Sequence, residues 1–323
     1  AAQYGQAPTR RLVTGEPIIV PVDSDVAHAA HLRRIARAAP LAGGYVLIAD
    51  NSQHRLMKFD RHGGLAAEGP LSSDSIGAPV SATAVGEFAD ESLVVVDQAG
   101  GKAHVYSAVR GVISERAQFR IGEVAVDACT AGDKLYVLGY SRGQLVHEYD
   151  SKGRAIKSFA QAPGGTEAER SGSLVGGAHI ACVGVGTVVL SRNVSADVRG
   201  YDQSGGDRWT FSVPDFRAAS VRVFPDGSIQ IHKNADKVDV TFSAFAASAD
   251  VVAVQVSRGD RPDPASGREY TVDTFLIGVR DGKLEGVQRG IPEIQAANGR
   301  NAIVKVSSRS VRVVPIAIDR GSR

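Results

Sequence analysis

Apolar and polar positions follow one unit that recurs along the chain. Its clearest copy spans 45–63, where an apolar run ends at Asp50, a polar turn follows, and a second run ends in Phe59-Asp60 before Gly63. The aromatic residue and the glycine return as Tyr106 and Gly111, Tyr149 and Gly153, and Tyr201 and Gly205. Self-similarity at about 40 to 50 residues is typical of β-propeller blades.

Each copy predicts two central antiparallel strands with a more polar outer strand after them. The first strand of each pair is almost continuously apolar, which fits a strand that is buried on both faces between neighbouring blades. The later pairs are Leu93–Val96 with Ala103–Tyr106, Leu135–Leu138 with Leu145–Tyr149, and Val188–Leu190 with Val198–Tyr201.

The two ends of the chain predict how a ring would close. A last repeat over 294–318 stops before the outer strand that the other copies have, and an unpaired strand edge is a liability. A strand at about 16–23 is available to fill that place. Residues 24–39 either begin a short helix at Ser24 that carries His28 and His31, or hold the innermost strand of the first blade, and we favour the strand.

The interval after Asp202 holds one blade and an extra hairpin. The hairpin is expected at about 219–240, and Val251–Val256 then pairs with Tyr270–Val279 across a long charged loop. We therefore expect one all-β domain over 1–323, a six-bladed β-propeller of four-stranded antiparallel blades. Seven blades are the alternative, if 203–290 holds two.

The stretch from Val46 to Gly63 resembles an NHL repeat, in which an apolar strand ending in Asp is followed by Asn, then by Arg before a second strand, an aromatic residue and a Gly turn. More widely, the chain is similar to six-bladed propellers of the NHL and TolB-like type. The resemblance implies a funnel-shaped ring with a binding site at one mouth of its channel. Relatives of this shape include lyases, metal-dependent hydrolases and scaffolds that bind peptides, proteins or glycans.

The turns between the central strands are expected on one face of the ring, and they supply the candidate site. Guanidinium groups bind carboxylate or phosphate through paired hydrogen bonds, so the arginines there favour an anionic small molecule, glycan or peptide as ligand. The alternative is that these are solvated turn residues, or that Asp50 pairs with Arg55 within its blade. The candidate ligand-binding residues are Asp50, His54, Asp97, Tyr140, Arg142, Arg192, Asn193 and Arg258.

A metal-dependent lyase or hydrolase is the second hypothesis, with Asp50, Asp97 and His54 around a divalent cation such as Ca²⁺. Calcium takes six to eight oxygen ligands, and only two carboxylates recur at this position of the repeat. The next copies carry Tyr140 and Arg192 there. We therefore predict no metal and no cofactor, and leave catalysis open.

Composition narrows the setting. Among 323 residues, 43% are hydrophobic and 22% charged, which is ordinary for a soluble globular protein, and no apolar run is long enough for a membrane helix. A net charge of +2 gives no reason to expect nucleic acid, and a monomer is expected. The chain starts Ala1-Ala2-Gln3 without Met, consistent with a removed signal peptide, and we favour an extracytoplasmic (periplasmic or secreted) location.

The two cysteines, Cys129 and Cys182, each precede the main strand of a blade. They are therefore expected on inner strands of neighbouring blades. A disulfide would need Cα atoms within ~7 Å. Cysteine is among the most buried residue types, so we favour two buried free thiols.

Overall fold

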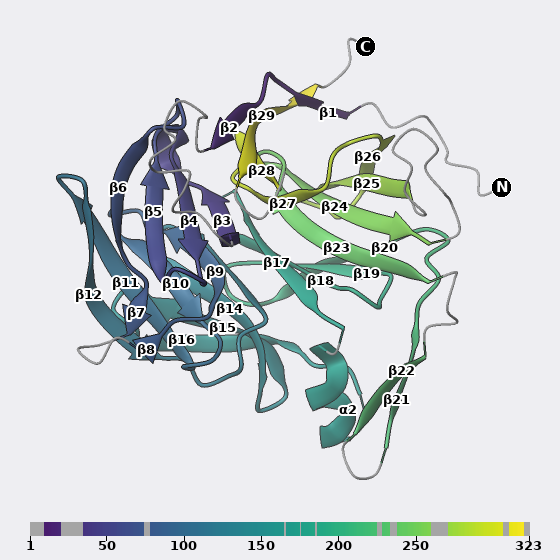
Figure 1. Cartoon of the computed structure of the whole chain (residues 1–323). Coiled ribbons are helices and arrows are strands. Elements are labelled where there is room, and N and C mark those ends of the chain that lie inside the picture. Colours follow the sequence, from purple (N-terminus) through teal and green to yellow (C-terminus); the bar gives the residue numbers. More distant parts are fainter. Residues whose placement is uncertain are drawn as a thin grey trace.

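The computed structural model describes residues 10–20, 35–73, 78–164, 166–174, 176–184, 186–224, 228–232, 238–259, 271–305 and 310–319. Over these residues the protein is all-β, with antiparallel sheets fanned around a common centre (Figure 1). The alternative of a helix within 24–34, and most of the loop between Arg258 and Thr271, lie outside the described residues. None of the described helices has the length and apolar character needed to cross a membrane.

Four-stranded antiparallel ladders recur along the chain. The first runs β3 (Ile35–Pro40), β4 (Val46–Asp50), β5 (Arg55–Phe59) and β6 (Leu65–Pro70). The second runs β9 (Ala82–Glu87), β10 (Leu93–Asp97), β11 (Lys102–Val109) and β12 (Val112–Arg120). A single parallel bridge between Glu68 and Val112 joins these two ladders into one eight-stranded sheet.

The third ladder comprises β13 (Asp127–Ala131), β14 (Lys134–Ser141), β15 (Gln144–Asp150) and β16 (Ala155–Gln161). The fourth comprises β17 (Ala178–Val183), β18 (Thr187–Arg192), β19 (Asp197–Tyr201) and β20 (Asp207–Ser212). The fifth comprises β23 (Asp239–Ala246), β24 (Val251–Arg258), β25 (Thr271–Gly278) and β26 (Leu284–Arg289).

The last sheet combines both ends of the chain. It holds β27 (Ile294–Ala297), β28 (Asn301–Lys305) and β29 (Val311–Asp319), and β29 also pairs antiparallel with β1 (Arg11–Thr14) and β2 (Ile18–Val20). The register places Leu12 opposite Ile318 and Ile19 opposite Arg312.

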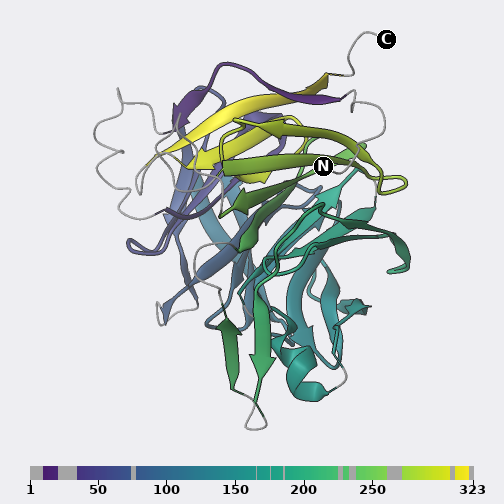
Figure 2. The same ribbon diagram turned by 90° about the vertical axis from the view of Figure 1, so that its right-hand side faces the viewer.

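Short elements connect or leave the main sheets. They are η1 (Ala42–Gly44), α2 (Glu167–Ser171), η2 (Gly172–Leu174), β7 (Ser72–Ser73), β8 (Ala78–Pro79), β21 (Ser220–Val223) and β22 (Ile229–His232). The β21–β22 pair forms its own two-stranded sheet and projects, beside α2, from one end of the molecule (Figures 1 and 2).

The first strand of each ladder faces the centre. We call β3, β9, β13, β17, β23 and β27 the first strands. Each contacts the next in chain order, and β27 in turn contacts β3. Strands β4 and β10 behind them are buried along their whole length, as their continuous apolar sequences predict.

The recurring Asp of the sequence repeat closes the hairpin between the third and fourth strands. Asp150 Oδ1 accepts the backbone N–H groups of Lys152 at 3.0 Å and Arg154 at 2.8 Å. Asp202 closes the next copy in the same way. Such Asx turns depend only on residues that are close in sequence, so this motif can be predicted without knowledge of the fold.

The recurring glycine has a second role, in packing between sheets. Gly205 has φ +86°, and a Cβ there would lie 2.8 Å from Cβ of Phe159 on β16 of the preceding sheet. Gly153 meets Phe119, and Gly282 meets Trp209, in the same relation. The turn therefore lies flat on an aromatic ring, which a side chain would displace.

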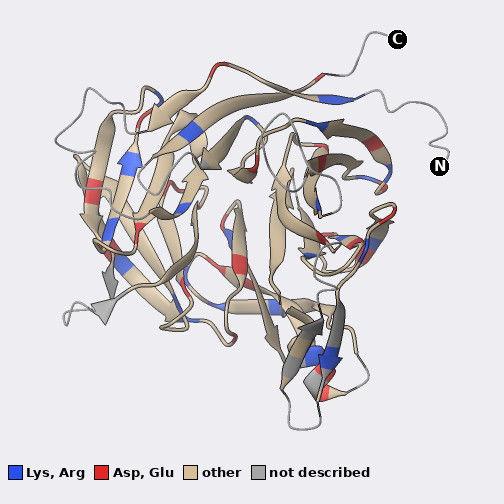
Figure 3. Ribbon diagram, turned by 45° about the vertical axis from the view of Figure 1, so that its right-hand side comes forward, with Lys and Arg blue, Asp and Glu red and all other residues tan. Residues whose placement is uncertain are grey.

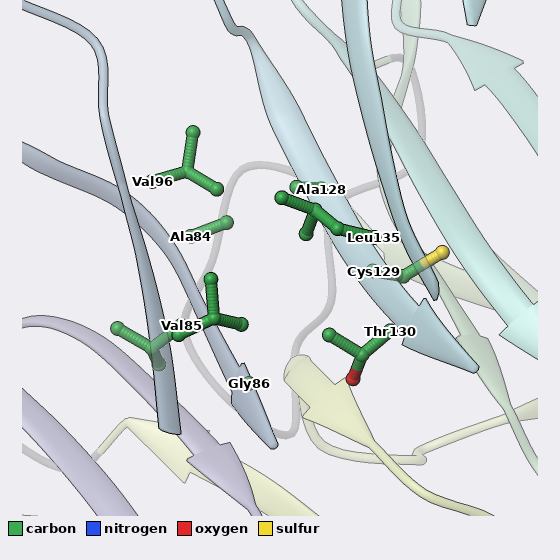
Figure 4. Close-up of a pocket in the computed structure, with 9 residues that line it drawn as sticks. Ala84, Val85, Gly86, Val96, Ala128, Cys129, Thr130 and Leu135 are labelled. Atoms are coloured by element: carbon green, nitrogen blue, oxygen red, sulfur yellow. The ribbon is translucent and has the colours of Figure 1, made fainter. Parts of the chain in front are cut away.

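Neighbouring sheets meet through apolar side chains. Between β9–β10 and β13–β14 they leave a small cavity, across which Ala84, Val85 and Val96 face Ala128 and Leu135 (Figure 4). The lining carries no charged group. This cavity is therefore a packing gap rather than a polar site.

The expectation of two free thiols is wrong. Cys129 on β13 and Cys182 on β17 form a disulfide, with Cα atoms 5.7 Å apart. Adjacent first strands approach closely enough at this level for their side chains to join. The link connects the third and fourth ladders covalently.

Candidate functional site

Asp50 and Asp97 are held by hydrogen bonds around their own turns. Asp50 is fully buried, and its Oδ1 accepts the N–H groups of Ser52 at 2.9 Å and Gln53 at 3.1 Å. Asp97 is 3% exposed and accepts the N–H groups of Ser81 at 2.9 Å and Ala99 at 3.1 Å. Both carboxylates stabilise backbone here.

Arg258 is buried in an ion network. Its Nη1 contacts Oδ2 of Asp239 at 2.8 Å, and its Nε contacts Oδ2 of Asp273 at 3.1 Å. It also donates to the carbonyl of Pro214 at 3.0 Å. Burial raises the pKa of Asp239, but hydrogen bonds from Arg217 and the Arg258 charge outweigh it and hold that pKa below its usual value. Arg258, on β24, therefore links β23 and β25 at one end of the fifth ladder.

Tyr140, Arg142 and His54 lie at the molecular surface. Tyr140 donates to Glu167 of α2 at 2.6 Å, and this hydrogen bond raises the pKa of the phenol. Arg142 and His54 are exposed and have φ values of 50° and 51°. Contacts with their own turns or with neighbouring elements hold Asp50, Asp97, Tyr140 and Arg258.

A different polar group forms where first strands begin. Arg37 (β3), Asp127 (β13) and His179 (β17) lie within electrostatic reach of one another. Together with Asn193 and Thr241 (β23) they form what we call the first-strand cluster. Elsewhere on the sheets, acidic and basic residues are interspersed (Figure 3). The first-strand cluster therefore stands out by its location on the first strands and not by an excess of one charge.

Arg37 is exposed and anchored from one side. Its Nε donates to the carbonyl of Thr83 on β9, and its Nη1 donates to the carbonyl of Ala36 at 3.2 Å. A guanidinium carries five N–H donors, so these two bonds leave donors for a further acceptor.

Asp127 and His179 form a close pair. Asp127 Oδ2 lies 3.9 Å from His179 Nδ1 and accepts the N–H of Ile180 at 3.1 Å. Burial raises the pKa of Asp127 to about 6, although the hydrogen bonds of Ile180 and Ala128 and the Arg37 charge oppose it. Burial, reinforced by Arg37, lowers the pKa of His179 to about 4, so the imidazole is neutral at pH 7.

Polar atoms beside this pair are buried and make no hydrogen bond of good geometry among the described residues. They are Nε2 of His179, Oδ1 of Asn193 and Oγ1 of Thr241. The three residues are neighbours. The backbone carbonyl of Asn193 accepts the backbone N–H of Thr241 at 3.1 Å, and hydrogen bonding of His179 with the Thr241 backbone and the Asn193 side chain raises the pKa of His179 against the larger effect of burial. A buried unpaired polar atom costs about 1–3 kcal/mol, so water or a ligand is expected to complete these bonds.

Of the eight predicted residues, Asn193 is the one whose contacts place it in this cluster. The sequence prediction missed Arg37, Asp127, His179 and Thr241, because it drew its candidates from the turns between central strands. One sequence signal could have pointed to them. Each lies in a first strand that is short and otherwise largely apolar. Among the described residues, no group of three or more His, Cys, Asp and Glu side chains gathers as a metal site.

No protein-family model matches this chain, and no curated protein matches it in sequence. Solved structures match this chain in fold. A member of the DUF4221 family from Bacteroides vulgatus aligns with a TM-score of 0.61 and 10% identity over 97% of this chain and 99% of that one. Virginiamycin B lyase from Staphylococcus aureus aligns with a TM-score of 0.52 and 10% identity over 95% and 100% of the respective chains. At these identities the likeness shows the β-propeller-like fold alone.

Proposed function

We propose that this chain is an extracytoplasmic six-bladed β-propeller, of the NHL and TolB-like type, that binds a small carboxylate-bearing ligand at one mouth of its channel. The contact of β27 with β3 supports a closed ring, as does the pairing of β1 and β2 with β29. In this arrangement the eight-stranded sheet is two blades joined at one bridge, and the N-terminal strands complete the last blade.

The disulfide supports the location. Disulfides persist in oxidising compartments and are rare in the cytosol. Cys129 and Cys182 are the chain's only cysteines, and they are joined to each other. A periplasmic or secreted protein is the setting in which such a link endures.

The observation that carries the binding proposal is the set of buried polar atoms beside Arg37, Asp127 and His179 that lack a hydrogen bond of good geometry. Arg37 supplies a charged donor for a carboxylate. Neutral His179, Asn193 and Thr241 supply donors and acceptors for an amide or hydroxyl. A peptide carboxyl terminus or an acidic sugar combines these groups.

Calorimetric titration tests this with a matched pair of probes, N-acetyl-alanyl-alanine and its amide. We expect the acid to bind about tenfold or more tighter, the value of one charge-assisted hydrogen bond. Arg37→Gln should reduce acid binding by that factor and leave amide binding unchanged. Arg61→Gln, which removes an exposed charge elsewhere, is the control. An acid–amide difference that survives in Arg37→Gln would remove Arg37 from the site.

A lyase or hydrolase is the second candidate. The observation that favours it is the Asp127–His179 pair at 3.9 Å, in which a carboxyl of raised pKa adjoins a neutral imidazole. A carboxyl whose pKa lies near 6 can accept or donate a proton close to neutral pH. The earlier version, with Asp50, Asp97 and His54 around a metal, gains no support, because those two carboxylates are occupied by turn N–H groups.

A further inference from the structure

A cleft separate from the first-strand cluster lies between the third and fourth ladders. Its wall on the fourth ladder carries Arg192, Asp197, Arg199 and Tyr201, and the third ladder contributes Leu145 and Gln161. Arg192 was expected beside Asn193 at a common mouth. The structure instead gives these sequence neighbours different surroundings.

Strand alternation explains why both arginines face this cleft. Side chains two apart on a strand share a face. Leu190 and Arg192 therefore share one face of β18, while Asp197, Arg199 and Tyr201 share one face of β19. The register sets Leu190 opposite Arg199, so the two sets lie on the same side of the sheet. That side packs against β15 and β16.

Among the residues that line the cleft, positive charge exceeds negative charge, and a second carboxylate, Asp207, lies close enough to Tyr201 to add to the effect of burial in raising the pKa of that phenol. Two guanidinium groups share the lining with the carboxylate of Asp197. Arg192 donates to Ser195 Oγ at 3.1 Å, a neutral acceptor. Burial lowers the pKa of Arg192, and the Arg199 charge lowers it further, against a smaller opposing effect of Asp197. An anion held between the guanidinium groups would relieve this repulsion.

From this lining we propose that the cleft is a second ligand site, for a sulfate- or phosphate-type oxyanion. Two guanidinium forks around one group need more acceptor oxygens than the two of a carboxylate, and a tetrahedral oxyanion offers up to four. Gln161 and Asp197 can bind hydroxyl groups, and Leu145 adds an apolar wall. The lining therefore suits an oxyanion carried on a sugar, with the free ion as the other source.

Calorimetric titrations at fixed ionic strength test the site with inorganic sulfate, D-glucose 6-sulfate and D-glucose. We expect both sulfates to bind and glucose not to bind. Arg199→Gln and Arg192→Lys should each weaken sulfate binding about tenfold or more, because each removes charge or the paired donor geometry. Arg208→Gln, an exposed charge on β20 of the same sheet, is the matched control.

The outcomes separate the possibilities. Tighter binding of glucose 6-sulfate than of sulfate assigns the site to a sugar-borne oxyanion, and equal binding assigns it to the free ion. Absence of sulfate binding, or equal losses in Arg199→Gln and Arg208→Gln, overturns the site. Arg37→Gln should leave sulfate binding unchanged, so failure of the first-strand cluster as a ligand site would leave this result standing. Urea unfolding of each variant confirms that it is folded.

Discussion

Replacing Glu123 by Gln should remove a large pH dependence of stability. The Glu123 side chain is 1% exposed and lies at the boundary of the second and third ladders. Its carboxylate oxygens accept from Tyr149 Oη at 3.1 and 3.3 Å, and Nδ1 of His147 lies 3.9 Å away. Burial raises the pKa of Glu123 from 4.5 to about 7, although hydrogen bonds from Tyr149 and from the backbone of Gly122 oppose it.

The sign and size follow from proton linkage. Below pH 4.5 the carboxyl is protonated in both folded and unfolded states, and the burial is not penalised. Between pH 4.5 and about 7 the unfolded state releases its proton while the folded state retains it, so the free energy of unfolding falls as pH rises. One pKa unit corresponds to ~1.4 kcal/mol, which gives a loss of about 3 kcal/mol that is complete above pH 7.

Urea unfolding of wild type and Glu123→Gln at half-unit steps from pH 4 to 8 measures this. The difference between the two proteins should be small at pH 4 and grow to about 3 kcal/mol in favour of Gln at pH 8, because other titrating groups cancel. Glu16→Gln, at an exposed position, should show no such trend. A pH-independent difference between wild type and Glu123→Gln would refute a buried carboxyl of raised pKa.

Further predictions concern the covalent link, the ion network and the turns. Replacing Cys129 and Cys182 together by Ser should lower the free energy of unfolding by about 4 kcal/mol, since the disulfide joins residues 53 apart, and thiol labelling of unreduced denatured wild type should find no free thiol. Arg258→Ala should cost about 3 kcal/mol in urea unfolding, because Oδ2 of Asp239 and Oδ2 of Asp273 lose their shared buried cation while Arg217 and Arg289 still pair with the Oδ1 atoms, and a cost under 1 kcal/mol would contradict the network. Gly205→Ala should lower thermal stability because of its positive φ and its contact with Phe159, and an unchanged melting temperature would contradict that packing.

Sequence reasoning succeeded where the chemistry is local. Asp150 and Gly153 act within a few residues of each other, so their turn can be predicted from the chain alone. The disulfide could not be resolved that way, because it depends on how closely two sheets approach. Composition favoured buried thiols for Cys129 and Cys182, but geometry joins them. The same limit hid the first-strand cluster, whose members come together across ladders that are distant in sequence.

Arg192 and Arg258 show what would sharpen such predictions. Both end the second strand of a ladder, so the repeat assigns them the same place. The register sets Ala178 opposite Arg192 but Asp239 opposite Arg258. A carboxylate opposite it on the first strand pairs with the Arg258 guanidinium and makes it structural. Arg192 has an alanine there, and Asp197 on β19 opposes only part of the effect of burial and of the Arg199 charge on the Arg192 pKa. The repeat predicts which residue lies opposite a recurrent charged position. The identity of that residue therefore distinguishes a stabilising arginine from a candidate for ligand binding.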